Sequence, residues 1–292
     1  MKWIKYIGVA IVVLLVVIAG FAYFAISSTE TRMAQSYSIN PTSLVIDTSA
    51  VAIDRGKHQS YIRGCVECHG GNFAGKTIIE SPEVGKFIGA NITGGKHSPV
   101  VNYSIQDWIR TVRYGVKPDG KPVIFMPSDE FSGISDQDLS DLLSYLTSIP
   151  AVDKDPGKTE VSPIFKLLAH VDRTVKILPA ELVNLKATAP SHVEPERTAS
   201  YGKYLAVTCT GCHGSGFTGG KIPGVPPDWP EAANLTKTGS LPKISNEKFR
   251  EILKTGINSE GRELNPTFMP YPIFKEFTEL EMDAIYMYLS SL

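Results

Sequence analysis

The sequence predicts a mostly helical protein, all-α in class, with an N-terminal transmembrane helix followed by two tandem domains. Three observations support this prediction. Residues 6–26 form an uncharged run, short motifs recur at a nearly constant offset in the second half of the chain, and an amphipathic run closes each half. The predicted organisation is an anchor and tether at 1–37, domains at 38–150 and 196–292, and a proline-rich connection at 151–195.

The N-terminal run is long enough to cross a bilayer, because about 20 apolar residues in a helix span the hydrocarbon core. Lys2 and Lys5 precede it, so the positive-inside tendency leaves the N-terminus cytoplasmic. A cleaved signal peptide is the alternative, but its apolar core is normally about 7–15 residues, and Ala22 and Ala25 offer only weak cleavage sites. We expect an uncleaved, single-pass anchor in a bacterial cytoplasmic membrane, with the later domains facing the periplasm or outside.

All four cysteines lie in two copies of one pattern, Cys-x-x-Cys-His, at residues 65–69 and 209–213. This spacing is typical of c-type haem attachment, in which two thiols bond the haem and the histidine binds the iron. Two copies predict two covalently attached c-type haems, each with one iron. The predicted attachment residues are Cys65 and Cys68 with His69, and Cys209 and Cys212 with His213.

Three other interpretations of the cysteines are less favourable. A redox dithiol gives the histidine no role and is expected in a βαβ context. A zinc site draws its ligands from pairs separated by a short spacer, whereas these pairs lie in different halves of the chain. Two disulfides are possible in an exported protein, but each would close a very small, strained loop. Haem attachment is favoured over all three.

The repeat extends beyond the cysteines. The Asn-Ile-Thr sequence at 91–93 corresponds to Asn-Leu-Thr at 234–236, and Phe-Met-Pro at 125–127 recurs at 268–270. Both pairs of motifs have the same offset along the chain. A single period of this length indicates a duplicated domain, since the units of solenoid proteins are far shorter.

The repeated methionines are predicted iron ligands. Met126 follows His69 at nearly the same distance in sequence as Met269 follows His213. Iron in a cytochrome c takes a histidine on one face and, on the other, a thioether that raises the reduction potential. The proline after each methionine discourages a helix, as a ligand on a loop requires. We therefore predict one iron held by His69 and Met126, and the other by His213 and Met269.

The remaining histidines have no counterpart in the other half of the chain, so none is expected on iron. They are His58, His97, His170 and His192. His58 lies on the predicted helix before the first haem motif. We expect it at the surface or beside a haem propionate.

On these motifs the two halves resemble class I cytochrome c domains, and the chain resembles a membrane-anchored di-haem cytochrome c. The resemblance covers about residues 40–150 and 190–292. It implies an N-terminal helix that carries the haem motif, a C-terminal helix that crosses it, and a methionine loop over the other face of the haem. Gly56 and Gly202, on the two expected N-terminal helices, would allow close crossing.

The connection between the domains holds six prolines from 150 to 195, which prevent one long helix. Its segments 164–168 and 175–178 are apolar enough to be buried. We expect a strap packed along one or both domains. A loose linker with incidental apolar residues is the alternative.

The composition and the predicted ligands together indicate an electron carrier. The formal net charge is −1, so no basic field exists to attract nucleic acid. Iron with both histidine and methionine ligands has no open position for a substrate, which argues against an enzyme. The expected role is a membrane-tethered relay that passes electrons between a respiratory complex or dehydrogenase and a terminal acceptor.

Three other functional classes stay open on the sequence. A cytochrome subunit of a periplasmic dehydrogenase resembles this chain, although those related to alcohol dehydrogenases usually carry three haems. The di-haem subunit of a haem-copper oxidase has the same order of anchor and haems, but typically has a longer segment before its anchor. A di-haem peroxidase or thiosulfate-oxidising enzyme needs an iron that opens or has an unusual ligand, which the two Phe-Met-Pro motifs do not favour.

Overall fold

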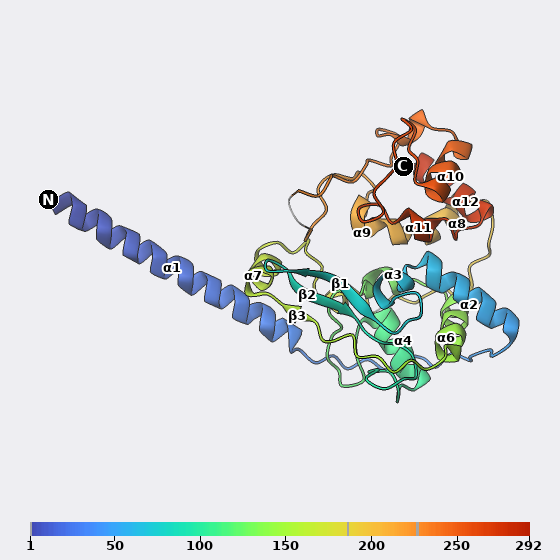
Figure 1. Ribbon diagram of the computed structural model, residues 1–292, viewed down its shortest axis with the longest axis horizontal. Coiled ribbons are helices and arrows are strands. Elements are labelled where there is room, and N and C mark those ends of the chain that lie inside the picture. The colour runs from blue at the N-terminus through green and yellow to red at the C-terminus, as the bar shows by residue number, and fades with distance from the viewer. Residues whose placement is uncertain (1, 186, 226–227) are drawn as a thin grey trace.

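One long helix and two helical units make up the computed structural model, which describes residues 2–185, 187–225 and 228–292 (Figure 1). The long helix α1 (Lys2–Met33) extends away from both units. Within the described ranges it is the one helix long and apolar enough to span a membrane. The predicted helical class, with an apolar N-terminal helix, is confirmed. The structure departs from the all-α prediction only in one small sheet among the described residues.

The first unit contains the expected helices before and after the first haem motif. In chain order its elements are α2 (Ala50–Ile62), α3 (Cys65–His69), β1 (Lys76–Ser81), β2 (Gly85–Gly89), α4 (Ile105–Tyr114), α5 (Ser128–Phe131) and α6 (Asp136–Ser148). Ser49, Ser104 and Ser135 cap the N-termini of α2, α4 and α6 by accepting a backbone N–H. These caps satisfy donors that would otherwise be unpaired and so set where the helices begin.

The second unit repeats this order without the strands. Its elements are α8 (Ala199–Ala206), η2 (Val207–Cys209), α9 (Thr210–His213), η3 (Leu241–Lys243), α10 (Asn246–Thr255), α11 (Tyr271–Phe274) and α12 (Glu279–Ser290). Thr198, Ser245 and Thr278 cap α8, α10 and α12. Because hydroxyl caps stand at matching places in both halves, the two halves build the same helices.

The first and last helices of each unit cross at a glycine, α2 on α6 and α8 on α12. An ideal Cβ on Gly56 would lie 1.8 Å from the carbonyl oxygen of Asp141, and one on Gly202 would lie 1.8 Å from that of Ala284. No side chain fits at either crossing, so the backbones touch. The predicted role of both glycines in close helix packing is confirmed.

A small antiparallel sheet in the order β1–β2–β3, with β3 spanning Glu160–Val161, is the part of the first unit that the all-α prediction missed. The ring of Phe87, on β2, packs against Phe125 and Phe165, with centroid distances of 4.8 and 5.6 Å. The third strand comes from the connection between the domains, far from β2 in sequence. A pairing that distant leaves no periodic pattern in a single segment.

The connection after α6 packs along the first unit. The side-chain amide of Asn91 donates to the carbonyl oxygens of Val152 and Lys154, at 2.8 and 3.0 Å. The backbone N–H of Phe125 donates to the carbonyl oxygen of Ile177 at 3.0 Å. These bonds support a packed strap over a loose linker, although the domain boundaries at 37, 150 and 195 stay predictions.

Two short helices lie in this strap, α7 (Pro163–Val171) and η1 (Pro179–Glu181). The expected burial is correct for Phe165 and for Val175, Ile177 and Leu178. It is wrong for Ile164 and Leu168, which are 60% and 41% exposed. The reason is geometric, because a helix turns neighbouring side chains to opposite faces and the first unit covers only one face of α7.

Candidate haem sites

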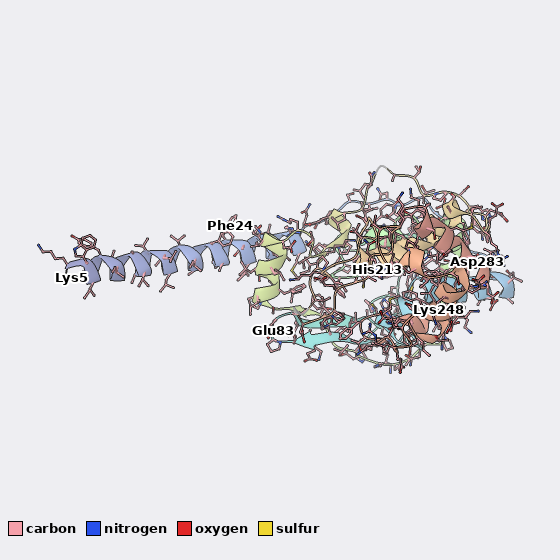
Figure 2. The ribbon with its side chains drawn as sticks, turned by 90° about the horizontal axis from the view of Figure 1, so that it is seen from above. Lys5, Phe24, Glu83, His213, Lys248 and Asp283 are labelled. Atoms are coloured by element: carbon pink, nitrogen blue, oxygen red, sulfur yellow. The ribbon has the colours of Figure 1, made fainter. Side chains whose placement is uncertain are left out.

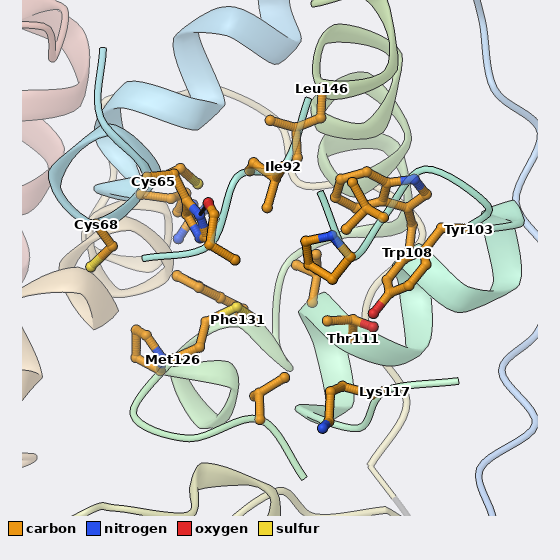
Figure 3. Close-up of a pocket in the computed structure, with 18 of the residues that line it drawn as sticks. Cys65, Cys68, Ile92, Tyr103, Trp108, Thr111, Lys117, Met126, Phe131 and Leu146 are labelled. Carbon is orange, nitrogen blue, oxygen red and sulfur yellow. Dashed lines mark hydrogen bonds between the residues drawn. The ribbon is translucent and has the colours of Figure 1, made fainter. Parts of the chain in front are cut away.

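An apolar cavity of about 330 Å³ lies in the first unit beside α3. Cys65, Cys68, His69 and Met126 all line it, and Figure 3 shows the methionine facing the same space as the two cysteines. The fold therefore brings to one cavity the four residues predicted for the first haem, although the methionine lies far from the motif in sequence.

Each predicted iron-binding histidine is held by a carbonyl oxygen. The Nδ1 atom of His69 lies 2.7 Å from the oxygen of Ala90, and Nδ1 of His213 lies 2.7 Å from the oxygen of Ala233. A carbonyl only accepts, so Nδ1 carries the proton and the Nε2 lone pair is left for a metal. Burial lowers the pKa of both histidines, which favours the neutral form that binds iron.

The repeated Asn-x-Thr sequence positions these carbonyl groups. Asn91 Oδ1 accepts from the backbone N–H and hydroxyl of Thr93, at 3.0 and 2.8 Å. Asn234 makes the same two bonds to Thr236, at 2.9 and 2.8 Å. Each asparagine directly follows the alanine whose oxygen faces the histidine. The motif is therefore a turn that fixes the acceptor of the histidine.

Both methionines begin the same tight turn. The N–H of Ser128 donates to Met126 O at 2.7 Å, and that of Tyr271 to Met269 O at 2.6 Å. The prolines between them have φ of −77° and −75° and ψ of 59° and 56°, an inverse γ-turn. A one-turn helix follows each, α5 and α11. Proline therefore presets the loop that carries the methionine.

The second unit repeats the packing around the predicted ligands of the first unit. Phe217 packs edge-on against Tyr288 with ring centroids 5.7 Å apart, and the equivalent pair Phe73 and Tyr145 has the same separation. His213 lies buried within the globular part of the molecule (Figure 2), and Met269 packs against the shared apolar core. The roles of the predicted ligands stay predictions, but both units hold them in matching local structures.

The other interpretations of the cysteines gain no support. None of the four is in a disulfide, and the described residues hold no group of three or more His, Cys, Asp or Glu side chains placed to bind a metal ion. Burial raises the pKa of Cys65 to about 12 and that of Cys68 to about 11. A redox dithiol or thiolate ligand needs a lowered pKa instead.

The residues lining the first cavity fit a c-type haem. A haem is flat and apolar, bonds thiols at one edge and carries two carboxylates elsewhere on its rim. Across the cavity from Cys65 and Cys68, groups able to donate hydrogen bonds gather (Figure 3): Tyr103, Trp108, Thr111 and Lys117. Such donors can receive carboxylates, while the rest of the lining is mainly apolar.

Arg63 also lines this cavity, although no sequence motif pointed to it. Its guanidinium lies 4.6 Å from the ring centroid of Tyr204, and its buried Nη2 has no hydrogen-bond partner among the described residues. A buried, unpaired guanidinium nitrogen suits an anionic ligand. The repeat could not reveal it, because Val207 stands at the corresponding place before the second motif.

The two units meet through equivalent residues. His58 Nε2 lies 2.8 Å from Glu281 Oε1, and the hydroxyl of Tyr204 donates to Asp138 Oδ2 at 2.5 Å. His58 and Tyr204 both lie two residues after the crossing glycine, and the two acids hold equivalent positions in the repeat. His58 is therefore an interdomain residue, which corrects its expected place at the surface or beside a propionate.

A second reciprocal contact lies at the haem motifs. Thr210, inside the second motif, donates to Glu130 of α5 at 3.4 Å. An ideal Cβ on Gly64, next to Cys65, would lie 3.6 Å from Ile273 of α11. Glu130 and Ile273 also hold equivalent positions in the repeat. The short helix after each predicted methionine ligand thus lies close to the haem-attachment segment of the other unit.

Comparison with known protein families agrees with this duplicated arrangement. The family model of cytochrome c matches residues 53–150 and 199–292, which is more than half of the chain. The chain belongs to the cytochrome c family. This membership confirms the predicted resemblance, covalently bound c-type haem as the cofactor and electron transfer as the chemistry, and it supports an electron carrier over a catalytic subunit.

Curated relatives of this cytochrome c are subunits of dehydrogenases. The chain is 29% identical over 127 residues to the fructose dehydrogenase cytochrome subunit of Gluconobacter japonicus, covering 41% of this chain and 26% of the relative. It is 31% identical over 104 residues to the cytochrome c subunit of the quinone alcohol dehydrogenase of Gluconobacter oxydans (strain 621H), covering 34% and 22%.

A third relative is the gluconate 2-dehydrogenase cytochrome c subunit of Pantoea cypripedii, which is 32% identical over 98 residues, covering 32% of this chain and 22% of the relative. The matches thus span about a quarter of the length of these relatives.

Proposed function

We propose that this cytochrome c binds two haems and relays electrons between them. One haem is attached to Cys65 and Cys68 with iron held by His69 and Met126, and the other to Cys209 and Cys212 with iron held by His213 and Met269. When bound, each haem supplies a one-electron couple whose potential is raised by the thioether ligand. The protein supplies the bonds, orients the imidazoles through Ala90 and Ala233, and surrounds the haems with apolar side chains.

The proposal of a relay rests on the reciprocal packing between the two units. Glu130 follows Met126 by four residues and touches Thr210 within the second haem motif. Ile273 follows Met269 by four residues and approaches Gly64 beside the first motif. The short helix after each ligand methionine therefore lies close to the attachment segment of the other haem. Such packing supports a short path for electrons within one molecule.

The long helix α1 supports the proposal of an uncleaved anchor. Ala25, a residue that a signal peptidase would need to reach, is fully buried, and Thr29 donates to Lys166 O at 2.9 Å. With Lys2 and Lys5 on the cytoplasmic side, both haem units would face the periplasm or outside. A protein tethered in this way meets its partners in the membrane at a raised local concentration.

Dehydrogenases are the favoured electron donors, because the relatives are cytochrome subunits of dehydrogenases. Electrons would enter from a periplasmic dehydrogenase and leave to a respiratory complex or terminal oxidase of the same membrane. An iron that keeps both protein ligands has no site for peroxide or thiosulfate. The proposed role is therefore transfer without catalysis at either haem.

The test uses the full chain in lipid nanodiscs. Partial reduction by a fast pulse should be followed by electron equilibration between two haems at a rate independent of protein concentration, because the step is intramolecular. Purification in mild detergent should retain a dehydrogenase or an oxidase. A rate proportional to concentration would overturn the relay, and rapid carbon monoxide binding with peroxide turnover would favour an enzyme.

A further inference from the structure

The strap helix α7 has an apolar face that the protein leaves uncovered. Ile164, Leu168 and Val171 are 60%, 41% and 63% exposed, and their spacing places them on one side of the helix. Phe165 and Ala169, on the other side, are buried. Three neighbouring aliphatic side chains on one helix face, all open, form a patch that normally marks an interaction surface. We call these three residues the α7 face.

Polar contacts fix α7 to the outer end of α1. Thr29 is buried and bonds Lys166 O, while Lys166 Nζ pairs with Glu30 at 2.7 Å. Arg32, in the last turn of α1, donates from Nη1 to the carbonyl oxygen of Ala169 in α7 at 3.3 Å, and it forms a two-pronged ion pair with Glu181 of η1, further along the strap. The position of the α7 face relative to α1 is therefore set by several bonds, and α7 does not depend on one flexible contact.

Aromatic contacts place α7 at the edge of the apolar run. The ring of His170 packs edge-on against Phe24 and Phe21, with centroid distances of 5.6 and 6.4 Å. Both phenylalanines belong to the uncharged run at 6–26. At about 1.5 Å per residue this run is about 30 Å long, which matches the hydrocarbon thickness of a bilayer. Phe24 then lies near the outer boundary of the hydrocarbon, and α7 lies at the same depth.

The arrangement of the whole molecule agrees with this depth. Figure 2 shows the strap helix, in yellow-green, running across α1 at the end of the globular part nearest the extended helix, with Phe24 beside it. If α1 spans the bilayer, α7 runs along the membrane plane. An amphipathic helix in that orientation buries its apolar side chains among the acyl chains and headgroups.

We propose that the α7 face rests in the outer leaflet of the membrane that α1 spans and seats the first haem unit against lipid. The inference rests on the proposed anchor. Because α7 packs directly on α1, and α1 would be surrounded by lipid, lipid is the partner that would cover the α7 face. Arg173, which is exposed and lies two residues beyond the face, suits the negatively charged headgroups. Because the strap also packs on the first unit, this contact would fix the orientation of the first haem site to the membrane.

The test is photocrosslinking in nanodiscs of phosphatidylcholine and phosphatidylglycerol, using the full chain. Three variants carry p-benzoylphenylalanine, one each at Leu168 in the α7 face, at Leu14 within the anchor, and at Val45, which is 90% exposed and lies outside α1 and α7. A normal haem spectrum confirms that each variant has folded. After illumination, intact mass identifies a lipid or protein adduct.

Lipid adducts at positions 168 and 14, with none at 45, are the expected result. An adduct at 14 but none at 168 overturns the inference about α7 and leaves the anchor intact, as does a protein–protein adduct at 168, which would mark a second copy as the occupant. The absence of a lipid adduct at position 14 would overturn both the proposed anchor and the inference about α7. A lipid adduct at 45 equal to that at 168 also overturns the inference, because labelling would then be independent of position.

Discussion

His58 Nε2 lies 2.8 Å from Glu281 Oε1 across the contact between the two units, 223 residues apart in sequence. The equivalent contact in the opposite direction joins Tyr204 to Asp138. The pair of contacts relates the units by an approximate twofold arrangement. A duplicated domain that meets its own copy in this way uses the same two surface positions twice, once from each side.

The His58–Glu281 pair should stabilise the contact in a pH-dependent way. Burial disfavours the charged imidazole, but the hydrogen bond and charge of Glu281 outweigh it and raise the pKa of His58. Its contribution is then fully present below the unfolded-state pKa of about 6.5 and is lost as pH rises through the higher folded value. His58→Ala should lower the free energy of unfolding by about 1 kcal/mol at pH 6 and by less at pH 9.

Thermal unfolding followed by circular dichroism at both pH values measures this difference. His192→Ala is the matched control, since His192 is exposed and pairs with Glu194 of its own segment. An equal loss of stability for His58→Ala at pH 6 and pH 9 would show that packing, and not charge, accounts for the effect.

Glu130 should link the potential of the second haem to pH. Burial is the main cause that raises its pKa to about 7, and the carboxyl faces Thr210 in the second haem motif. Above this pKa the carboxylate favours the oxidised haem, which carries one more positive charge. One midpoint potential should therefore fall as pH rises through about 7, and Glu130→Gln should remove that dependence.

Potentiometric titration at several pH values tests this linkage. Glu196→Gln changes an exposed acid just after the strap and serves as the control. The potential that responds to Glu130 should be the one that Met269→His shifts. An unchanged pH slope in Glu130→Gln would refute the role of this carboxyl.

Replacing each predicted thioether ligand should lower one potential. Met126→His and Met269→His exchange a ligand that favours reduced iron for one that favours it less. Each variant should lower one midpoint potential and remove part of the weak methionine–iron absorption at long wavelength. Met287→Leu, at a position 45% exposed, should change neither. Unchanged spectra in both histidine variants would mean that other residues bind the iron.

The two haem motifs should bind haem independently. Cys209→Ala combined with Cys212→Ala should leave one covalent haem per chain, and the natural chain should keep two after denaturation, because thioether bonds survive unfolding. Intact mass and the pyridine haemochrome spectrum measure the number. Retention of two haems by the double variant would contradict the assignment of the second motif.

A methyl group at either helix crossing should be costly. Gly202→Ala would place Cβ 1.8 Å from a backbone oxygen of α12, so the helices must separate. We expect a loss of about 2 kcal/mol in the free energy of unfolding, as for other overpacked cores. Gly133→Ala, where nothing lies within 4 Å of the added group, should be close to neutral in the same denaturant titration.

The sequence alone was sufficient for the local parts of this protein. The haem motifs and the methionine loops each act within a few residues, and their recurrence at a nearly constant offset shows that they are not chance matches. The Asn-x-Thr sequences could be recognised as part of the repeat, but their turn beside the histidine came from the structure. The glycine crossings were also predictable, because a position that admits no side chain selects one residue type. The uncharged apolar run at 6–26 likewise specifies, by its length, a helix able to span a bilayer.

Only the tertiary structure decided how these parts meet. The pairing of β3 with β2, that of His58 with Glu281 and that of Glu130 with Thr210 each join residues far apart in the chain, and neither a repeat nor a periodicity records such pairings. The same holds for α7. Its composition is equally apolar whether the protein or a membrane covers it, so the burial of Phe165 and the exposure of Leu168 follow from which face the first unit occupies.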